Sequence, residues 1–217
     1  MNERIMPYDY KSISRLVLAS SSPRRKELVA TLDLSLPVSV FSLDTDETVQ
    51  ADWSPSETVE QLSLAKATAV REALLAGEAE EISFDENSLI LAADTIVLLD
   101  NDILGKPTSI EDSVKTLMRL QGREHQVLTG VTLLHTLTGE QLVQHRVTHV
   151  KMRPLSVEMI RSYVATGESA DKAGSYGIQG KGSILVDSIK GCYFNVVGLP
   201  ISLVAEMLQN FDVLVLQ

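Results

Sequence analysis

The sequence predicts an α/β fold, because apolar segments typical of strands alternate with segments that carry helix-capping signals. The clearest strand signal is a nearly continuous apolar run over residues 89–99, of the kind found in strands that are covered on both faces. The clearest helix signal is a capping box that begins at Ser54. The 217 residues are enough to bury a substantial core, as one compact domain or as two lobes that share a cleft.

A strand is expected over residues 15–19, followed by a helix over about 23–32 with Ser22 as its N-cap. A strand that turns into a helix N-terminus presents backbone N–H groups and the positive end of the helix dipole to an anion. Arg24 and Arg25 lie in the first turn, where the dipole disfavours cations. They therefore suggest a phosphate ligand, which a guanidinium can bind through two N–H groups. The alternative is a pair of solvated surface arginines.

A strand around residues 38–42 is followed by the acidic run 44–48, which could supply a carboxylate to a hard cation such as Mg²⁺. The next helix is expected from Ser54 to about residue 76, with Gly77 as its stop. Its packed stripe is predicted to comprise Leu62, Ala65, Ala69 and Ala73, with Lys66 on the edge. The alternative to a functional Lys66 is a side chain that lies along the stripe with its ammonium in water.

Asp94 interrupts the apolar run in its middle. An unpaired buried charge is costly, so Asp94 should meet a metal, a cation or hydrogen-bond donors. Residues 100–102 have turn composition and should return the chain so that Lys106 approaches the same region. Asp94 is therefore either a functional carboxylate or half of a buried structural ion pair with Lys106.

The second half of the chain continues the alternation. Ser109 should cap a helix over about 110–121, with Val114, Leu117 and Met118 inward. The remaining elements are expected as antiparallel strands at 125–137 and 141–153, a helix at 157–166, a glycine-rich loop at 167–182, a strand at 183–189 and a helix from about 200 to 210. Gln179 in the loop carries both a donor and an acceptor, as recognition of a nucleobase edge requires.

The composition of the chain limits its possible binding partners and its cellular compartment. The formal net charge of −10 weighs against a nucleic-acid polymer or an anionic membrane as partner, but it allows a small phosphorylated ligand. No apolar run reaches the roughly 20 residues that span a bilayer, and the N-terminus lacks the pattern of a signal peptide. The single cysteine, Cys192, excludes a disulfide framework. We therefore expect a cytoplasmic protein.

Eight segments of the chain, in order, resemble the Maf family of nucleoside triphosphate pyrophosphatases. They are Leu18-Ala-Ser-Ser-Ser-Pro-Arg-Arg25, Asp46-Glu-Thr48, Leu64-Ala-Lys-Ala67, Ala93-Asp-Thr95, Gly105-Lys-Pro107, Gly122-Arg-Glu-His-Gln-Val-Leu-Thr-Gly-Val131, Asp171-Lys-Ala-Gly-Ser-Tyr-Gly-Ile-Gln-Gly180 and Asn195-Val-Val-Gly-Leu-Pro200. Each segment is weak evidence alone, whereas all eight in the right order are highly specific.

The resemblance implies an α/β fold with an elongated, twisted, mixed sheet flanked by helices, and two lobes around a nucleotide cleft. Residues 15–217 would form one such domain behind an N-terminal extension, residues 1–14, and the protein would be a homodimer. The implied reaction cleaves a nucleoside triphosphate between its α- and β-phosphates with Mg²⁺ or Mn²⁺. Asp94 matches the proton acceptor and a metal ligand, and Glu47 a second metal ligand. The residues that match the family's phosphate site are Ser20, Arg24, Arg25, Lys66 and Lys106. The residues that match positions tied to base selectivity are Arg24, Thr95 and Gln179.

The segment from Tyr176 to Gly180 resembles the subgroup that acts on dTTP and UTP, so the predicted substrate is one of these or a modified pyrimidine nucleotide. Two alternatives differ from this prediction. One is a nucleotide-binding regulator of septum formation without turnover, and the other is the same chemistry on 7-methyl-GTP or inosine triphosphate. The Asp94, Glu47 and lysine set favours an enzyme, because a protein that only binds nucleotides needs no carboxylate to activate water.

Overall fold

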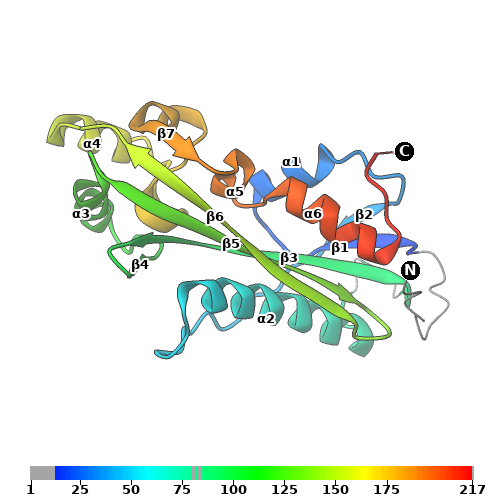
Figure 1. Ribbon diagram of the computed structural model, residues 1–217. Coiled ribbons are helices and arrows are strands. Elements are labelled where there is room, and N and C mark those ends of the chain that lie inside the picture. The colour runs from blue at the N-terminus through cyan, green and yellow to red at the C-terminus, as the bar shows by residue number, and fades with distance from the viewer. Residues whose placement is uncertain (1–12, 80–81, 83–84, 217) are drawn as a thin grey trace.

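Three antiparallel strands of 12 residues each form the centre of the structure and give it an elongated, twisted shape (Figure 1). This computed structural model describes residues 13–79, 82 and 85–216, so the predicted N-terminal extension lies outside it except for Ile13 and Ser14. The strands are β1 (Arg15–Leu18), β2 (Val38–Val40), β3 (Ser88–Leu99), β4 (Asp102–Leu104), β5 (Glu124–His135), β6 (Gln141–Met152) and β7 (Val186–Lys190). Their order is β2-β1-β3-β5-β6-β7, with β4 paired to β3. Because β1 runs parallel to both of its neighbours and the other pairs are antiparallel, the predicted mixed sheet is confirmed.

Helices cover both faces of this sheet (Figure 1). They are α1 (Pro23–Ala30), α2 (Pro55–Ala76), α3 (Ile110–Leu120), α4 (Val157–Val164), α5 (Tyr193–Val197) and α6 (Ile201–Leu208), with short 3₁₀ segments at Ala173–Ser175, Gly180–Leu185 and Gln209–Phe211. Helix α2 packs on one face of the sheet, against β3 and β5. Helices α1, α5 and α6 lie on the opposite face. Helices α3 and α4 lie at the far end of the sheet, where β3 ends and β5 begins. One apolar core joins β1, α1 and α6, and a second joins α3, α4 and the far ends of β3 and β5. These two cores form the two predicted lobes.

Two predicted helix faces differ from the structure by a small rotation. In α2, Leu62 and Ala73 are buried as expected, but Ala65 is exposed and the packed face runs instead through Ala67 and Val70. This face follows spacings of three and four residues, which keep side chains on one side of a helix. In α3, Val114 and Leu117 pack as predicted.

The prediction for Met118 in α3 is wrong, because this side chain is 39% exposed and Leu120 takes its place in the core. The prediction of a strand from residue 183 is wrong in its start, because a 3₁₀ segment occupies residues 180–185 before β7. Helix α5 was not predicted. Its five residues include Tyr193, Phe194 and two valines, all of modest helix propensity, so local sequence favours no helix there.

Helix α2 lies very close to the sheet at Gly130 of β5. A Cβ atom at this position would lie 2.1 Å from the Val59 carbonyl oxygen and 2.9 Å from the Glu60 nitrogen, both of which are backbone atoms of α2. Gly130 is also the direct cross-strand partner of Asp94. The missing side chain therefore allows α2 to lie against the sheet beside the central carboxylate.

Replacing Gly130 with alanine is expected to lower the free energy of unfolding by about 3 kcal/mol or more, because a rigid backbone must move to relieve the overlap. Gly105→Ala is the matched control, since nothing lies within 4 Å of its added Cβ. Urea unfolding followed by circular dichroism measures both variants. Equal stabilities for the two would show that α2 does not press on β5.

Candidate active site

The site lies at a gap in the pairing of β3. On one edge of β3, β1 pairs with it as far as Leu91 and β4 pairs with it from Val97 onwards. Between these two pairings, the described strands leave residues 92–96 of that edge without a partner. Asp94 and Thr95 lie in this gap, and both line a cleft of about 760 Å³. The apolar run identified in the sequence is thus buried along its whole length except at Thr95, the residue after Asp94, which is partly exposed to the cleft.

Asp94 meets the side chains of α2 and of the acidic loop before it. Lys66 of α2 donates a hydrogen bond to Asp94 Oδ1, and its Nζ lies 2.7 Å from Oε1 of Glu47. The side chains of Asp94 and Lys66 are only 11% and 17% exposed, so this contact is shielded from water. Asp94 therefore has the cationic partner that its burial requires, but the partner is Lys66 and not Lys106.

The same lysine holds the pKa of the Glu47 carboxyl below its usual range, chiefly through its hydrogen bond, with burial opposing the shift. Lys106 and Arg25 lower this pKa further by their charge. Glu47 is consequently ionised at neutral pH. Two carboxylates thus converge on one ammonium group within a cleft that other cations also line.

Thr95 follows Asp94 along the strand, so its side chain points to the opposite face of the sheet. There it accepts a hydrogen bond from Nη2 of Arg25 at 3.1 Å, while Nε of Arg25 donates to the Gly198 carbonyl at 2.8 Å. Burial lowers the pKa of Arg25, and the charge of Asp94 opposes this shift. Because the usual pKa of arginine is so high, the guanidinium stays charged at neutral pH.

The structure brings all the residues predicted for the site into one cleft. The predicted residues that line it are Ser20, Arg24, Arg25, Glu47, Lys66, Asp94, Thr95, Lys106 and Gln179. Ser22 caps α1 as predicted, since its hydroxyl accepts from the backbone N–H of Arg25. The two arginines of α1 therefore face the cleft and not the bulk solvent, although Arg24 and Arg25 remain partly exposed.

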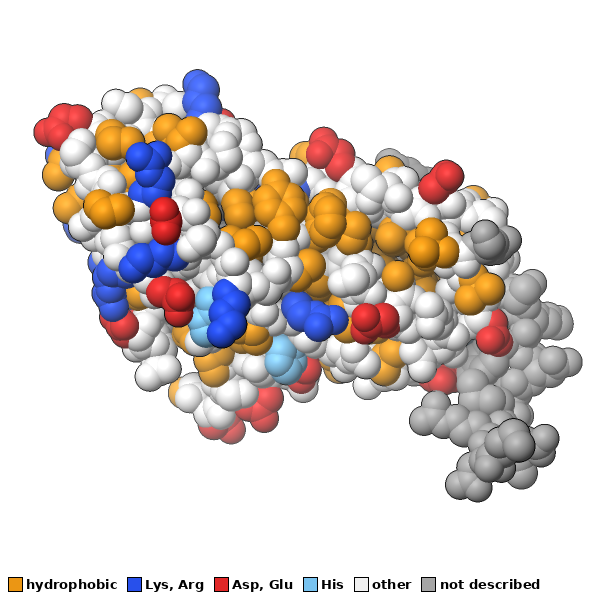
Figure 2. Space-filling view, turned by 45° about the horizontal axis from the view of Figure 1, so that its top comes forward, with side chains coloured by type: hydrophobic (Ala, Val, Ile, Leu, Met, Phe, Trp, Pro, Cys, Tyr) orange, Lys and Arg blue, Asp and Glu red, His pale blue; other side chains and the backbone are white. Residues whose placement is uncertain are grey.

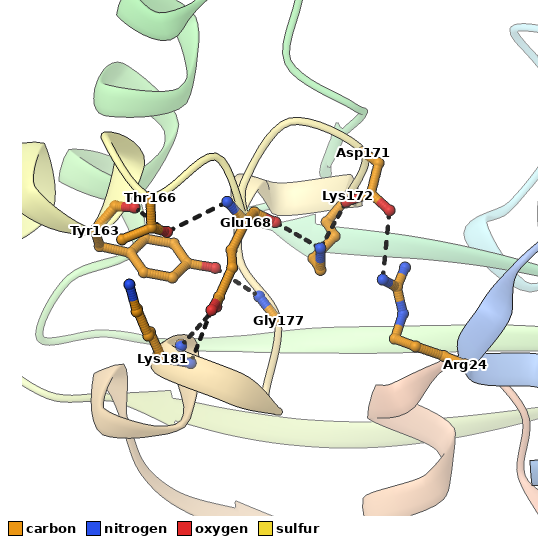
Figure 3. Close-up of polar contacts among 9 residues, drawn as sticks. Arg24, Tyr163, Thr166, Glu168, Asp171, Lys172, Gly177 and Lys181 are labelled. Carbon is orange, nitrogen blue, oxygen red and sulfur yellow. Dashed lines mark hydrogen bonds and ion pairs between the residues drawn. The ribbon is translucent and has the colours of Figure 1, made fainter. Parts of the chain in front are cut away.

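The glycine-rich loop forms the opposite wall of the cleft, and Figure 3 shows how it is held. Glu168 accepts hydrogen bonds from the backbone N–H groups of Lys181 and Gly182 at 3.0 and 3.1 Å. The Tyr163 hydroxyl accepts from the Gly177 N–H at 3.1 Å. These bonds hold the loop in place as one wall of the cleft.

Sequence reasoning assigned no role to two charged residues of this wall. Asp171 lies 3.4 Å from Nη1 of Arg24 and 2.6 Å from Nζ of Lys172, and both Asp171 and Lys172 line the cleft (Figure 3). The Asp171–Arg24 pair thus connects α1 in one lobe with the loop in the other. Asp171 and Lys172 both belong to the segment 171–180, which resembles the family pattern. This resemblance is the one sequence signal that could have identified them.

Tyr176 anchors the loop from within. Its hydroxyl is 2.7 Å from Nε2 of His125, and the two rings meet edge to face with centroids 5.4 Å apart. His125 is buried, and its burial lowers the histidine pKa from 6.5 to about 4. Between these values the unfolded chain binds a proton that the folded chain does not, so the free energy of unfolding falls as the pH falls through this window.

His125→Gln is expected to remove about 3 kcal/mol of the stability difference between pH 7 and pH 4, since the shift of the pKa from 6.5 to about 4 is worth that much. Urea unfolding at several pH values in this range measures the slope for the parent and the variant. If the free energy of unfolding changed with pH equally in the parent and in the His125 variant, this account would be contradicted.

The fold and the cleft together define a class of protein. It is an α/β protein in which arginine and lysine side chains from both lobes line a cleft around two carboxylates, an arrangement suited to a polyphosphate. The profile of the family described as "Maf-like protein" matches residues 15–211. The chain therefore belongs to the Maf family, as its sequence motifs indicated.

Curated relatives with similar sequences support this membership over nearly the whole chain. The protein of Desulforamulus reducens is 45% identical over 198 residues, which cover 91% of this chain and 97% of the relative. The protein of Symbiobacterium thermophilum is 46% identical over 199 residues, covering 92% and 95%. That of Clostridioides difficile is 39% identical over 196 residues, covering 90% and 94%. Each of these three proteins is named "dTTP/UTP pyrophosphatase".

Proposed function

We propose that the chain is a nucleoside triphosphate pyrophosphatase that hydrolyses dTTP and UTP to the monophosphate and pyrophosphate. The names of its relatives support this activity. The observation that carries the proposal is the contact of Lys66 with both Glu47 and Asp94, inside a cleft that further cations line. Such a site combines charge neutralisation with a shielded base, the two contributions that hydrolysis of a phosphoanhydride requires.

The cations of the cleft are proposed to hold the triphosphate. Arg24, Arg25, Lys66 and Lys106 together balance the roughly four negative charges of such a ligand. Ser20, at the turn before α1, adds a hydroxyl beside the N-terminus of this helix. These groups would act mainly by positioning and by stabilising charge as it moves onto the leaving group.

Asp94 is proposed to accept the proton of the attacking water. The water oxygen forms a bond to the α-phosphorus, the bond from that phosphorus to the bridging oxygen breaks, and pyrophosphate leaves with the bonding electrons. The proton goes to Asp94 and is later released to solvent. The Asp94 side chain is only 11% exposed. This burial suits the role, because a base in a shielded cleft is not surrounded by bulk water.

A divalent cation, Mg²⁺ or Mn²⁺, is proposed as the cofactor. The donor chemistry fits, because Asp94 and Glu47 converge on one positively charged group, and Mg²⁺ is commonly held by one or two carboxylates together with phosphate oxygens. When bound, the ion supplies charge neutralisation of the phosphate oxygens and a lower pKa for a coordinated water.

Base selectivity is proposed to depend on Arg24, Thr95 and Gln179, which line the same cleft. Gln179 is exposed at the end of the glycine-rich loop and can offer both a donor and an acceptor to a pyrimidine edge. The ion pair of Arg24 with Asp171 fixes one side of the region where the base would lie.

A panel of canonical and modified nucleoside triphosphates, assayed with and without Mg²⁺, tests the function. Chromatography of the products should show monophosphate and pyrophosphate, fastest from dTTP and UTP and only with the metal. A preference for 7-methyl-GTP or inosine triphosphate would contradict the proposed substrate. Release of orthophosphate and a diphosphate would contradict the proposed site of cleavage, and binding of dTTP without turnover would favour the regulator.

The proposed assembly is a homodimer in the cytoplasm, where nucleoside triphosphates are abundant. Figure 2 shows apolar side chains gathered along the face that carries α5 and α6, and Tyr193 and Phe194 of α5 are 39% and 38% exposed. Apolar residues exposed together favour association. In the described part of the chain, no helix is both long and apolar enough to span a membrane. Light scattering on the purified protein would measure its oligomeric state.

A further inference from the structure

Two of the segments that resemble the family contain buried polar residues to which the proposed function assigns no role. Thr129 belongs to β5 and Asn195 to α5; both are fully buried. Neither residue lines the cleft. Their hydrogen bonds nevertheless lead to Arg25, whose guanidinium does line it.

The bonds form a closed ring. Nε of Arg25 donates to the Gly198 carbonyl at 2.8 Å, and the Gly198 N–H donates to the Asn195 carbonyl at 3.1 Å. The same Asn195 carbonyl accepts the Thr129 hydroxyl at 3.0 Å. The Thr129 and Thr95 hydroxyl oxygens are 2.9 Å apart, and Thr95 accepts from Nη2 of Arg25 at 3.1 Å. Every member of the ring is thus joined to two others.

The direction of each bond follows from its chemistry. A carbonyl only accepts, so the Thr129 hydroxyl proton is committed to Asn195. Thr95 must then donate its own proton to Thr129, and its oxygen is left to accept from Arg25, which only donates. This single consistent arrangement leaves no hydroxyl of the ring free to rotate.

The Asn195 side chain fixes the ring to the sheet. Its Nδ2 donates to the Val127 carbonyl at 2.9 Å and to the Thr148 hydroxyl at 3.0 Å. Thr148 in turn binds the backbone N–H of Cys192 at 3.1 Å, so the segment that leads into α5 is held on β6. One acceptor of Arg25, Thr95, thus belongs to β3, and the other, Gly198, follows a helix that Asn195 ties to β5 and β6.

The ring also determines which part of Arg25 faces the ligand. Nε and Nη2 lie on one side of the planar guanidinium, and that side is bonded to Gly198 and Thr95. Among the described residues, no acceptor is bonded to Nη1. The end of the guanidinium, formed by Nη1 and the outward N–H of Nη2, remains for two ligand oxygens.

We propose that Thr129 and Asn195 are positioning residues, which orient Arg25 through Thr95 and Gly198 so that the end of its guanidinium binds two phosphate oxygens of the substrate. This proposal rests on the proposed function for the identity of the ligand.

The test compares Thr129→Val, which keeps the shape and loses the hydroxyl, with Thr129→Ser, which keeps the hydroxyl. Thr129→Val is expected to lower kcat/KM for dTTP at least about tenfold, because small displacements of a positioning group have effects up to about a hundredfold. Thr129→Ser should stay within about twofold of the parent, since it preserves the hydrogen bonds. The matched control is Thr132→Val on the same strand, a buried threonine bonded to Ser63 at 2.8 Å on the α2 side.

A second comparison separates positioning from a merely structural effect. If Thr129 acts through Arg25, adding Thr129→Val to Arg25→Lys should change kcat/KM less than about twofold, because residues that act as one unit are not additive. Full additivity of the two changes, or an equal loss in Thr132→Val, would overturn the proposal. So would a folded Thr129→Val protein with the activity of the parent.

Magnetic resonance on the ligand-free protein tests the ring without any turnover. The Arg25 Nε–H signal, assigned by its absence in Arg25→Lys, should exchange slowly with water in the ligand-free protein and quickly in Thr129→Val. Fast exchange in the parent would overturn the proposal. A slow signal in a parent that hydrolyses no nucleotide would support the ring and refute the proposed function, so the two failures are distinguishable.

Discussion

Replacing Asp94 with asparagine is expected to lower kcat for dTTP about a thousandfold, within the range that a positioned general base contributes. Asparagine has nearly the same shape as aspartate and can still accept the hydrogen bond of Lys66, so the side chain should stay in place. It cannot accept a proton from water. The change therefore keeps the shape of the cleft but removes the proposed base, and with it one of the two carboxylate charges proposed to hold the metal.

The measurement is steady-state release of pyrophosphate with Mg²⁺ at neutral pH, with thermal unfolding as the check on folding. Asp102→Asn is the matched control, because Asp102 of β4 pairs with Arg119 at 2.7 Å and does not line the cleft. It should retain the parent rate. An Asp94 variant that hydrolyses dTTP at the parent rate would refute the assignment of the base.

The need of Asp94 for a partner could be predicted from the sequence, but the identity of the partner could not. A charge within an apolar run must be compensated, and this argument requires no structure. Lys106 seemed the natural partner because a turn returns the chain nearby. The structure instead brings Lys66 from α2, 28 residues away in the sequence. That contact depends on how closely α2 lies on β5, which Gly130 decides.

The same limit explains the errors in the helix faces and in α5. Apolar periodicity predicts that a helix is amphipathic, but several phases fit a helix rich in alanine, and packing selects among them. Ala65 was therefore placed inward although it is exposed. Helix α5 is held by Asn195, whose hydrogen bonds reach β5 and β6. Such long-range contacts leave no local pattern in the sequence.

Some cleft residues could be predicted because their types conflict with local preference, whereas others, such as Ser20 and Thr95, were predicted only from the resemblance to the family. Arg24 and Arg25 stand in the first turn of α1, where the dipole disfavours cations, and the structure places both along the cleft. Conflicts of this kind are expected at functional sites. Asp171 shows no such conflict, since it is an ordinary acidic residue in a loop. Its ion pair with Arg24, seen in the structure, shows that it belongs to the cleft wall.

Replacing Lys66 with methionine is expected to lower kcat/KM for dTTP about a hundredfold, comparable to the loss of one strong electrostatic donor. Methionine preserves much of the length and apolar volume of the side chain but removes its charge. Because the hydrogen bond of Lys66 is the largest cause of the lowered pKa of Glu47, that pKa should rise when the bond is lost. The acidic limb of the profile of kcat/KM against pH should then move to higher pH.

Initial rates from pH 3.5 to pH 9 measure both effects, and Lys115→Met serves as the control at an exposed position of α3 outside the cleft. Lys66→Arg is informative as a third variant, since it restores the charge but presents a planar fork in place of a compact ammonium. It should recover the position of the acidic limb better than it recovers the rate. If Lys66→Met lost activity with no movement of that limb, Lys66 would serve the phosphates alone, and its contact with Glu47 would have no part in keeping that carboxylate ionised.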